Sequence, residues 1–149
     1  VCTPGQIQRY LSKISGPLLD RIDIQCEISP LPFRDLSKAE QGESSTDIRE
    51  RVLRARRIQT ERFKNYPNIH CNAQMSERMI HEFIEPDDQS LEILRKAMEN
   101  LKLSARAYNR ILKVARTIAD LEASPKVQVH HIAEAIGYRS LDRGDWGER

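Results

Sequence analysis

The stretch SARAYNRILKVARTIADL, from Ser104 to Leu121, places the strongest constraint on what this chain can fold into. On a helix with about 3.6 residues per turn, its apolar residues form one stripe. They are Tyr108, Ile111, Leu112, Ala115, Ile118 and Ala119. The side-chain oxygen of Ser104 can accept a hydrogen bond from an unpaired N–H of the first turn. The sequence therefore predicts a helix that packs by its apolar side.

The opposite side of this helix is basic and carries Arg106, Arg110 and Lys113. Charged helix faces usually contact solvent, which is the simplest expectation for these side chains. For Arg110, Lys113 and Arg116 the pattern predicts only solvation or a domain contact.

A bundle of about five helices is predicted from residue 46 to about residue 140. Asp47 is expected to cap the first helix, with Glu50 as its capping-box partner. The apolar stripe of this helix is Ile48, Val52, Ala55 and Phe63. Ser76 is expected to cap a second, short helix.

Asp87 or Asp88 should begin a third helix, which is expected to pack antiparallel, or nearly so, against 104–121. A last helix, with Val129 and Ile136 on its apolar side, should end at Gly137 in a left-handed cap. The predicted fold is therefore mainly α.

The residues before this bundle have a different pattern. A short helical pattern ends at the breakers Ser15, Gly16 and Pro17. From Ile22 to Ile28 apolar and polar residues alternate, which predicts a half-buried strand. A lone strand is unstable, so its sheet should lie in sequence outside this chain. Residues 31–45 are predicted to be a flexible linker and 141–149 a polar tail.

The composition, with 39% hydrophobic and 31% charged residues and a formal charge of +2, is typical of a soluble helical protein. No apolar run approaches the roughly 20 residues of a membrane span. The N-terminus has no signal peptide and no initiator Met, so we expect a piece of a longer protein. The cysteine pattern favours reduced thiols and therefore a cytoplasmic location.

Metal sites are not predicted. Cys2, Cys26 and Cys71 share no CxxC spacing and are expected to be reduced thiols. Adjacent residues on a helix point about 100° apart, and no carboxylate stands at ligand spacing from His130 and His131. These histidines are therefore expected on the surface or in the core.

Catalytic motifs are missing from the sequence: there is no GxxxxGK[ST], no GxSxG and no HExxH. A self-contained enzyme is not expected. Arg21 stands at the edge between a breaker segment and the predicted strand, where its planar guanidinium could be presented to phosphate oxygens. The alternative, which spacing favours, is a local ion pair with Asp20 or Asp23.

The predicted helix over 47–64 is rich in arginine, but its charges spread around most of its circumference. This favours a solvated helix. One alternative is an autonomous nucleic-acid-binding module that uses 49–64 and 106–116. Another is a purely structural oligomerisation domain.

The segments ISGPLLDRIDI, SARAYNRILKVARTIADL and HHIAEAIGYRSLDR closely resemble the C-terminal part of magnesium-chelatase-like AAA+ ATPases of the competence protein ComM type. The resemblance implies that residues 1 to about 30 are the end of the ATPase core and that 46–140 are the helical lid domain. It implies that Arg21 is an arginine finger acting on the neighbouring subunit, and that Arg106 is the sensor 2 arginine facing the γ-phosphate. Cys2 matches the last cysteine of an upstream cluster whose other ligands are absent here.

The same resemblance implies a full-length ring ATPase that uses ATP and Mg²⁺ and acts on DNA as a branch-migrating helicase in natural transformation. Its expected partners are its own core and neighbouring subunits. Some relatives are labelled magnesium chelatase subunits or ATP-dependent proteases, which stays an alternative. This chain alone should bind no cofactor tightly and be monomeric.

Overall fold

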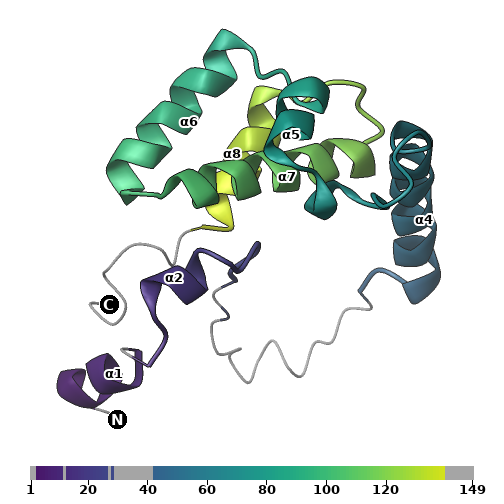
Figure 1. Cartoon of the computed structure of the whole chain (residues 1–149). Helices are drawn as coiled ribbons and strands as arrows, with labels where there is room; N and C mark the ends of the chain where they lie inside the picture. The colour runs from purple at the N-terminus through teal and green to yellow at the C-terminus, as the bar shows by residue number, and fades with distance from the viewer. Residues whose placement is uncertain (1–2, 12, 27, 29–41, 140–149) are drawn as a thin grey trace.

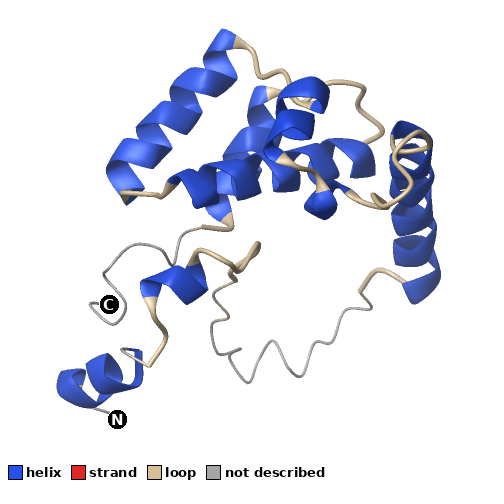
Figure 2. Cartoon of the chain, in the orientation of Figure 1, coloured by secondary structure: helices blue, strands red, loops and turns tan. Residues whose placement is uncertain are grey.

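The computed structural model describes residues 3–11, 13–26, 28 and 42–139. Within these residues the chain is helical and contains no β-strand (Figure 2). Its helices are α1 (Pro4–Leu11), α2 (Gly16–Leu19), α4 (Ser45–Arg62), the 3₁₀ turn η1 (Asn72–Gln74), α5 (Glu77–Phe83), α6 (Asp88–Leu101), α7 (Ala105–Leu121) and α8 (Val129–Gly137). The predicted mainly α fold is confirmed, with five α-helices from α4 to α8 in the described residues.

Helix α7 lies at the centre of the bundle (Figure 1). It contacts α4, η1, α5 and α8. The residues of its predicted stripe that are at most 8% exposed are Ile111, Leu112, Ala115, Ile118 and Ala119. Tyr108 is half-buried. The stripe forms one core with Leu94 of α6 and Ile132 of α8, so the prediction for this helix is confirmed.

The sequence predicted that α6 packs antiparallel to α7, and this prediction is wrong. The main contact of α6 is with α8. The chain leaves α6 through Lys102, which is left-handed with φ 50°. It then enters α7 after Leu103 and Ser104. Helix α6 therefore joins the bundle mainly through α8.

The predicted strand from Ile22 to Ile28 is wrong for the residues that the structure describes there, which have no regular secondary structure. Ile22, Ile24 and Ile28 are 39%, 52% and 90% exposed. A strand needs a neighbouring strand for its hydrogen bonds, and the described part of the chain supplies none. One backbone bond of this segment goes to the end of α8, where the Tyr138 carbonyl accepts the N–H of Gln25 at 3.0 Å.

The residues before this segment form two short helices. α1 confirms the first helical pattern, whereas two of the three predicted breakers, Gly16 and Pro17, begin α2. Proline is tolerated in a first turn, where the missing N–H would have no intrahelical partner anyway. The predicted linker, except for residues 42–45, and the whole predicted tail lie outside the described residues.

Side-chain caps begin several helices of the bundle. The predicted caps that accept a first-turn N–H are Ser76, Asp87 and Ser104. The predicted cap Asp47 is wrong: Ser44 caps α4 and accepts the N–H of Asp47 at 3.2 Å. Helix α8 ends at Gly137, as predicted, but the left-handed cap is wrong, because the C-cap is Tyr138 with φ −74°.

Candidate functional site

Arg21 lies in a tight turn directly after α2. Its N–H donates to the carbonyl of Leu18 and that of Ile22 to the carbonyl of Leu19, both at 3.0 Å. The Arg21 side chain is exposed and has no hydrogen bond or ion pair with the described residues. The local ion pair favoured by spacing is therefore absent there, because Asp20 and Asp23 face other arginines.

This turn is held against the helical bundle. The guanidinium of Arg139, which follows α8, donates through Nη1 to the carbonyls of Ile22 and, at 3.5 Å, of Leu19. Its Nη2 lies 3.8 Å from the carboxylate of Asp20. On α7, Arg110 forms an ion pair with Asp23. Figure 1 shows α2 lying below the ends of α7 and α8.

Arg106 lies in the first turn of α7. Ser104 caps this turn by accepting the N–H of Ala107 at 3.2 Å. The Arg106 side chain is exposed and, like that of Arg21, has no hydrogen bond or ion pair with the described residues. Because unpaired N–H groups and the positive end of the dipole lie at a helix N-terminus, this turn suits an anion.

The remaining basic residues of α7 bind other parts of the protein, so of the two predicted alternatives the structure shows contacts in place of full solvation. Arg110 pairs with Asp23, and Lys113 donates to the Ala73 carbonyl at 3.0 Å. Desolvation, followed by the nearby positive charge of Arg110, lowers the pKa of Lys113. Arg116 is only 2% exposed.

A buried ionic network surrounds Arg116. Its guanidinium contacts Asp120, 3.0 Å away, on the next turn of α7. Asp120 also accepts from Arg62 at the end of α4, at 2.7 Å, and from Asn72 at 2.8 Å. Burial lowers the pKa of Arg116, while Asp120 opposes that shift. Sequence reasoning missed this network, although the Arg116–Asp120 spacing of four residues was a signal for it.

Glu122, His130 and His131 bring potential ligand atoms within 4.8 Å of one another, so the expectation that no carboxylate stands near these histidines is wrong. His131 is buried, and its Nδ1 accepts the N–H of Gln128 at 2.9 Å. The ring proton must then lie on Nε2, which donates to Glu122 at 2.9 Å. Because metal binding needs an unprotonated nitrogen, these bonds favour a link between α7 and α8 over a metal centre.

The cysteines add no site among the described residues. Cys26 and Cys71 are free thiols, as expected. Cys2 lies outside the described residues, so its predicted place in an upstream cluster stays a prediction.

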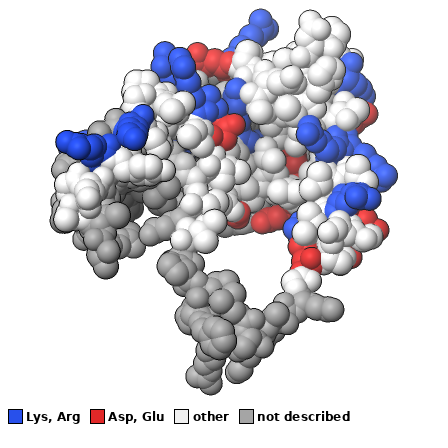
Figure 3. Space-filling view, turned by 90° about the horizontal axis from the view of Figure 1, so that it is seen from below, with Lys and Arg blue, Asp and Glu red and all other residues white. Residues whose placement is uncertain are grey.

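Among the described residues, helix α4 carries most of the other arginines. Ala55 and Phe63 of its predicted stripe are buried, whereas Ile48 and Val52 are 42% and 43% exposed. Arg62 points into the buried network. Figure 3 shows Lys and Arg in separate groups, with Asp and Glu among them, on the face seen from below. This face offers no continuous basic surface in the described residues.

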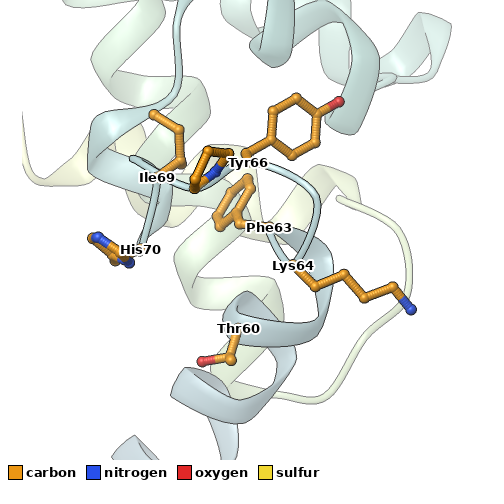
Figure 4. A pocket seen from close by; sticks show the side chains of 7 residues that line it. Thr60, Phe63, Lys64, Tyr66, Ile69 and His70 are labelled. Carbon is orange, nitrogen blue, oxygen red and sulfur yellow. The ribbon is translucent and has the colours of Figure 1, made fainter.

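A small hollow of about 220 Å³ lies where α4 ends (Figure 4). Its lining includes the ring of Phe63, which packs edge-to-face on Tyr66. Lys64 extends away from the ring, and His70 lies on the other side (Figure 4). The polar groups of the lining come from Thr60, Lys64, Tyr66 and His70, and the lining contains no carboxylate.

The described residues thus form a helical bundle, and the turn that carries Arg21 is held against it. Two family models match the chain. "Magnesium chelatase, subunit ChlI C-terminal" matches residues 42–139, and "Magnesium chelatase, subunit ChlI" matches residues 1–36. The chain belongs to the family of ChlI C-terminal domains.

Curated relatives match over nearly the whole chain. It is 43% identical to competence protein ComM of Haemophilus influenzae over 142 residues, or 95% of the chain. It is 41% identical to the protein YifB of Escherichia coli over 143 residues and 32% identical to a Mycobacterium tuberculosis protein over 139 residues. The chain spans 27% of the length of each relative.

Among the described helices, none combines the length and apolar character that crossing a membrane requires.

Proposed function

We propose that this chain is the C-terminal part of a subunit of an AAA+ ring ATPase, in which Arg21 is the arginine finger for the nucleotide of the neighbouring subunit. The observation that carries the proposal is the contrast between arginines. Arg110, Arg116 and Arg139 bind acids or carbonyls, whereas Arg21 is exposed at a turn that the bundle holds in place. A phosphoryl-transfer transition state gathers negative charge, which such a guanidinium stabilises.

Arg106 is the proposed sensor 2 residue of the same subunit. Its position in the first turn of α7 supports this role, because the helix dipole and the guanidinium would both favour the γ-phosphate. ATP and Mg²⁺ would bind the longer protein, since this sequence contains no phosphate loop.

The proposed work of the ATPase is the remodelling of DNA, through branch migration, in the cytoplasm. One relative is named a competence protein, and the same resemblance underlies this part of the proposal. The alternative motor roles are those of a magnesium chelatase or an ATP-dependent protease subunit.

The finger is tested in the longer, assembled protein. Arg21→Ala should lower kcat for ATP by about 10³- to 10⁵-fold while leaving nucleotide affinity unchanged. Arg106→Ala should weaken the nucleotide response and turnover. The matched control is Arg78→Ala, an exposed arginine of α5, which should behave as wild type.

Mixing subunits tests whether the finger acts in trans. Arg21→Ala subunits should regain ATPase activity when mixed with subunits whose phosphate-loop lysine is replaced, because mixed interfaces then contain one intact site. Normal hydrolysis by Arg21→Ala alone would refute the assignment.

A second candidate is an autonomous nucleic-acid-binding module, for which the observation is that Arg49, Arg54, Arg56 and Arg57 of α4 are all exposed. Binding of this chain to duplex DNA with a steep salt dependence, weakened by Arg54→Ala and Arg57→Ala, would favour it. Absence of binding at low salt would exclude it. Arg62 and Arg116 cannot contribute, because they face Asp120.

A further inference from the structure

Arg139 is one of the most buried side chains in the described part of the chain, with 1% of its surface exposed. It directly follows Tyr138, the C-cap of α8, yet its hydrogen bonds reach back 117 and 120 positions, to the carbonyls of Ile22 and Leu19. These two carbonyls stand on either side of the turn that carries Arg21. A buried charge so far from its partners in sequence indicates a specific contact.

The chemistry of arginine suits this contact. The Leu19 carbonyl ends α2, where carbonyls lack intrahelical donors, and the Ile22 carbonyl lies beyond the helix. A guanidinium offers five N–H donors in a planar fork, so one side chain can bind two carbonyls and still face the carboxylate of Asp20. A lysine would keep the charge but not the fork.

Two further contacts fasten the same segment. The Tyr138 carbonyl accepts the N–H of Gln25 at 3.0 Å, and Arg110 pairs with Asp23. The turn is therefore fixed to the end of α8 and to the first half of α7.

We propose that Arg139 is a positioning residue for Arg21: it fixes the Arg21 turn on the helical bundle, so that the turn and the bundle move as one body. This inference rests on the proposed role of Arg21. The bundle also carries Arg106, one turn before Arg110 on α7. A shift of the bundle when Arg106 meets its nucleotide would therefore displace Arg21 at the neighbouring nucleotide.

The contact itself is tested on this chain by amide hydrogen exchange. Arg139→Gln should raise the exchange rate of residues 19–25 about tenfold while α6 and α7 keep their protection. Arg139→Lys should give an exchange rate between those of wild type and Arg139→Gln. It serves as the test if the glutamine variant does not fold. The matched control is Arg95→Gln, an exposed arginine of α6, which should leave residues 19–25 unchanged. Unchanged exchange in both Arg139 variants would overturn the proposal.

The consequence is tested on the longer, assembled ATPase. Arg139→Gln should lower kcat about 10²-fold at unchanged KM, because a finger displaced by about 1 Å loses most of its effect. In an Arg21→Ala background the same substitution should have no further effect. A merely destabilising change would instead add to the loss.

The two proposals fail in different ways. If Arg21→Ala hydrolyses ATP normally while Arg139→Gln loosens residues 19–25, the contact stands and the finger is refuted. If Arg21→Ala is inactive while Arg139→Gln keeps both exchange and kcat, the finger stands and the positioning role is refuted.

Discussion

Arg110 of α7 and Asp23, 87 positions apart in the sequence, form an ion pair beside the turn that carries Arg21. Both side chains are partly exposed, at 31% and 46%. Surface pairs of this kind contribute little energy, so the contact affects where the segment lies more than how stable the chain is.

A double-mutant cycle with Arg110→Gln and Asp23→Asn should therefore give a coupling energy of about 0.2 to 1 kcal/mol, which shrinks as salt is added. Urea unfolding of the two single variants and the double variant at low and high salt measures it. A coupling that salt leaves unchanged would contradict the picture of a partly exposed pair.

Asp120→Asn should be severely destabilising. The substitution leaves Arg116 buried without its carboxylate and removes the partner of Arg62. Breaking a buried pair in this way costs about 3–5 kcal/mol. Urea unfolding followed by circular dichroism measures the loss. Glu99→Gln, which breaks an exposed pair with Arg95, is the control and should cause a much smaller change.

Ser104→Ala should cost about 1 kcal/mol of unfolding free energy, because the N–H of Ala107 loses its acceptor. Thermal or urea unfolding measures this cost. Ser104→Asp keeps an acceptor and places negative charge at the positive end of α7, so it should retain most of the stability. Equal losses in both variants would show that the cap contributes nothing.

The contact of Glu122 with His130 and His131, which links α7 to α8, should make the unfolding free energy depend on pH. Hydrogen bonds from His130 and His131 hold the pKa of Glu122 below its ordinary value of 4.5. A carboxyl with a lowered folded pKa stabilises the chain above its unfolded pKa, and this stabilisation is lost as pH falls through the folded pKa. Below about pH 4.5 the unfolding free energy of wild type should therefore fall more steeply than that of Glu122→Gln.

Urea unfolding over a pH series checks this prediction. Glu85→Gln, an exposed glutamate between α5 and α6, should follow the wild-type slope. Identical slopes for wild type and Glu122→Gln would contradict it.

The bundle could be predicted because its signals are local. The stripe of α7 and the caps Ser76, Asp87 and Ser104 each depend on residues within a turn or two. The spacing of the apolar residues correctly predicted the buried face of α7, because these residues recur every three or four positions along the helix.

Long-range contacts could not be predicted in this way. The alternation from Ile22 to Ile28 satisfied a strand pattern, but a strand depends on a partner that local sequence does not reveal. The burial of Arg116 was also not predicted, because two of its acceptors, Ser124 and Pro125, lie in the loop after α7, and helical periodicity does not show how a loop folds back. The contact of Arg139 could not be predicted either, because its acceptors are main-chain carbonyls, which every residue has.

That last contact has a practical consequence for labelling. Because Arg139 binds the main-chain oxygens of Leu19 and Ile22, the anchorage does not depend on which side chain occupies position 21. A fluorophore or spin label could be attached through Arg21→Cys while its backbone stays docked. Such a probe would report directly on the surroundings of the Arg21 turn.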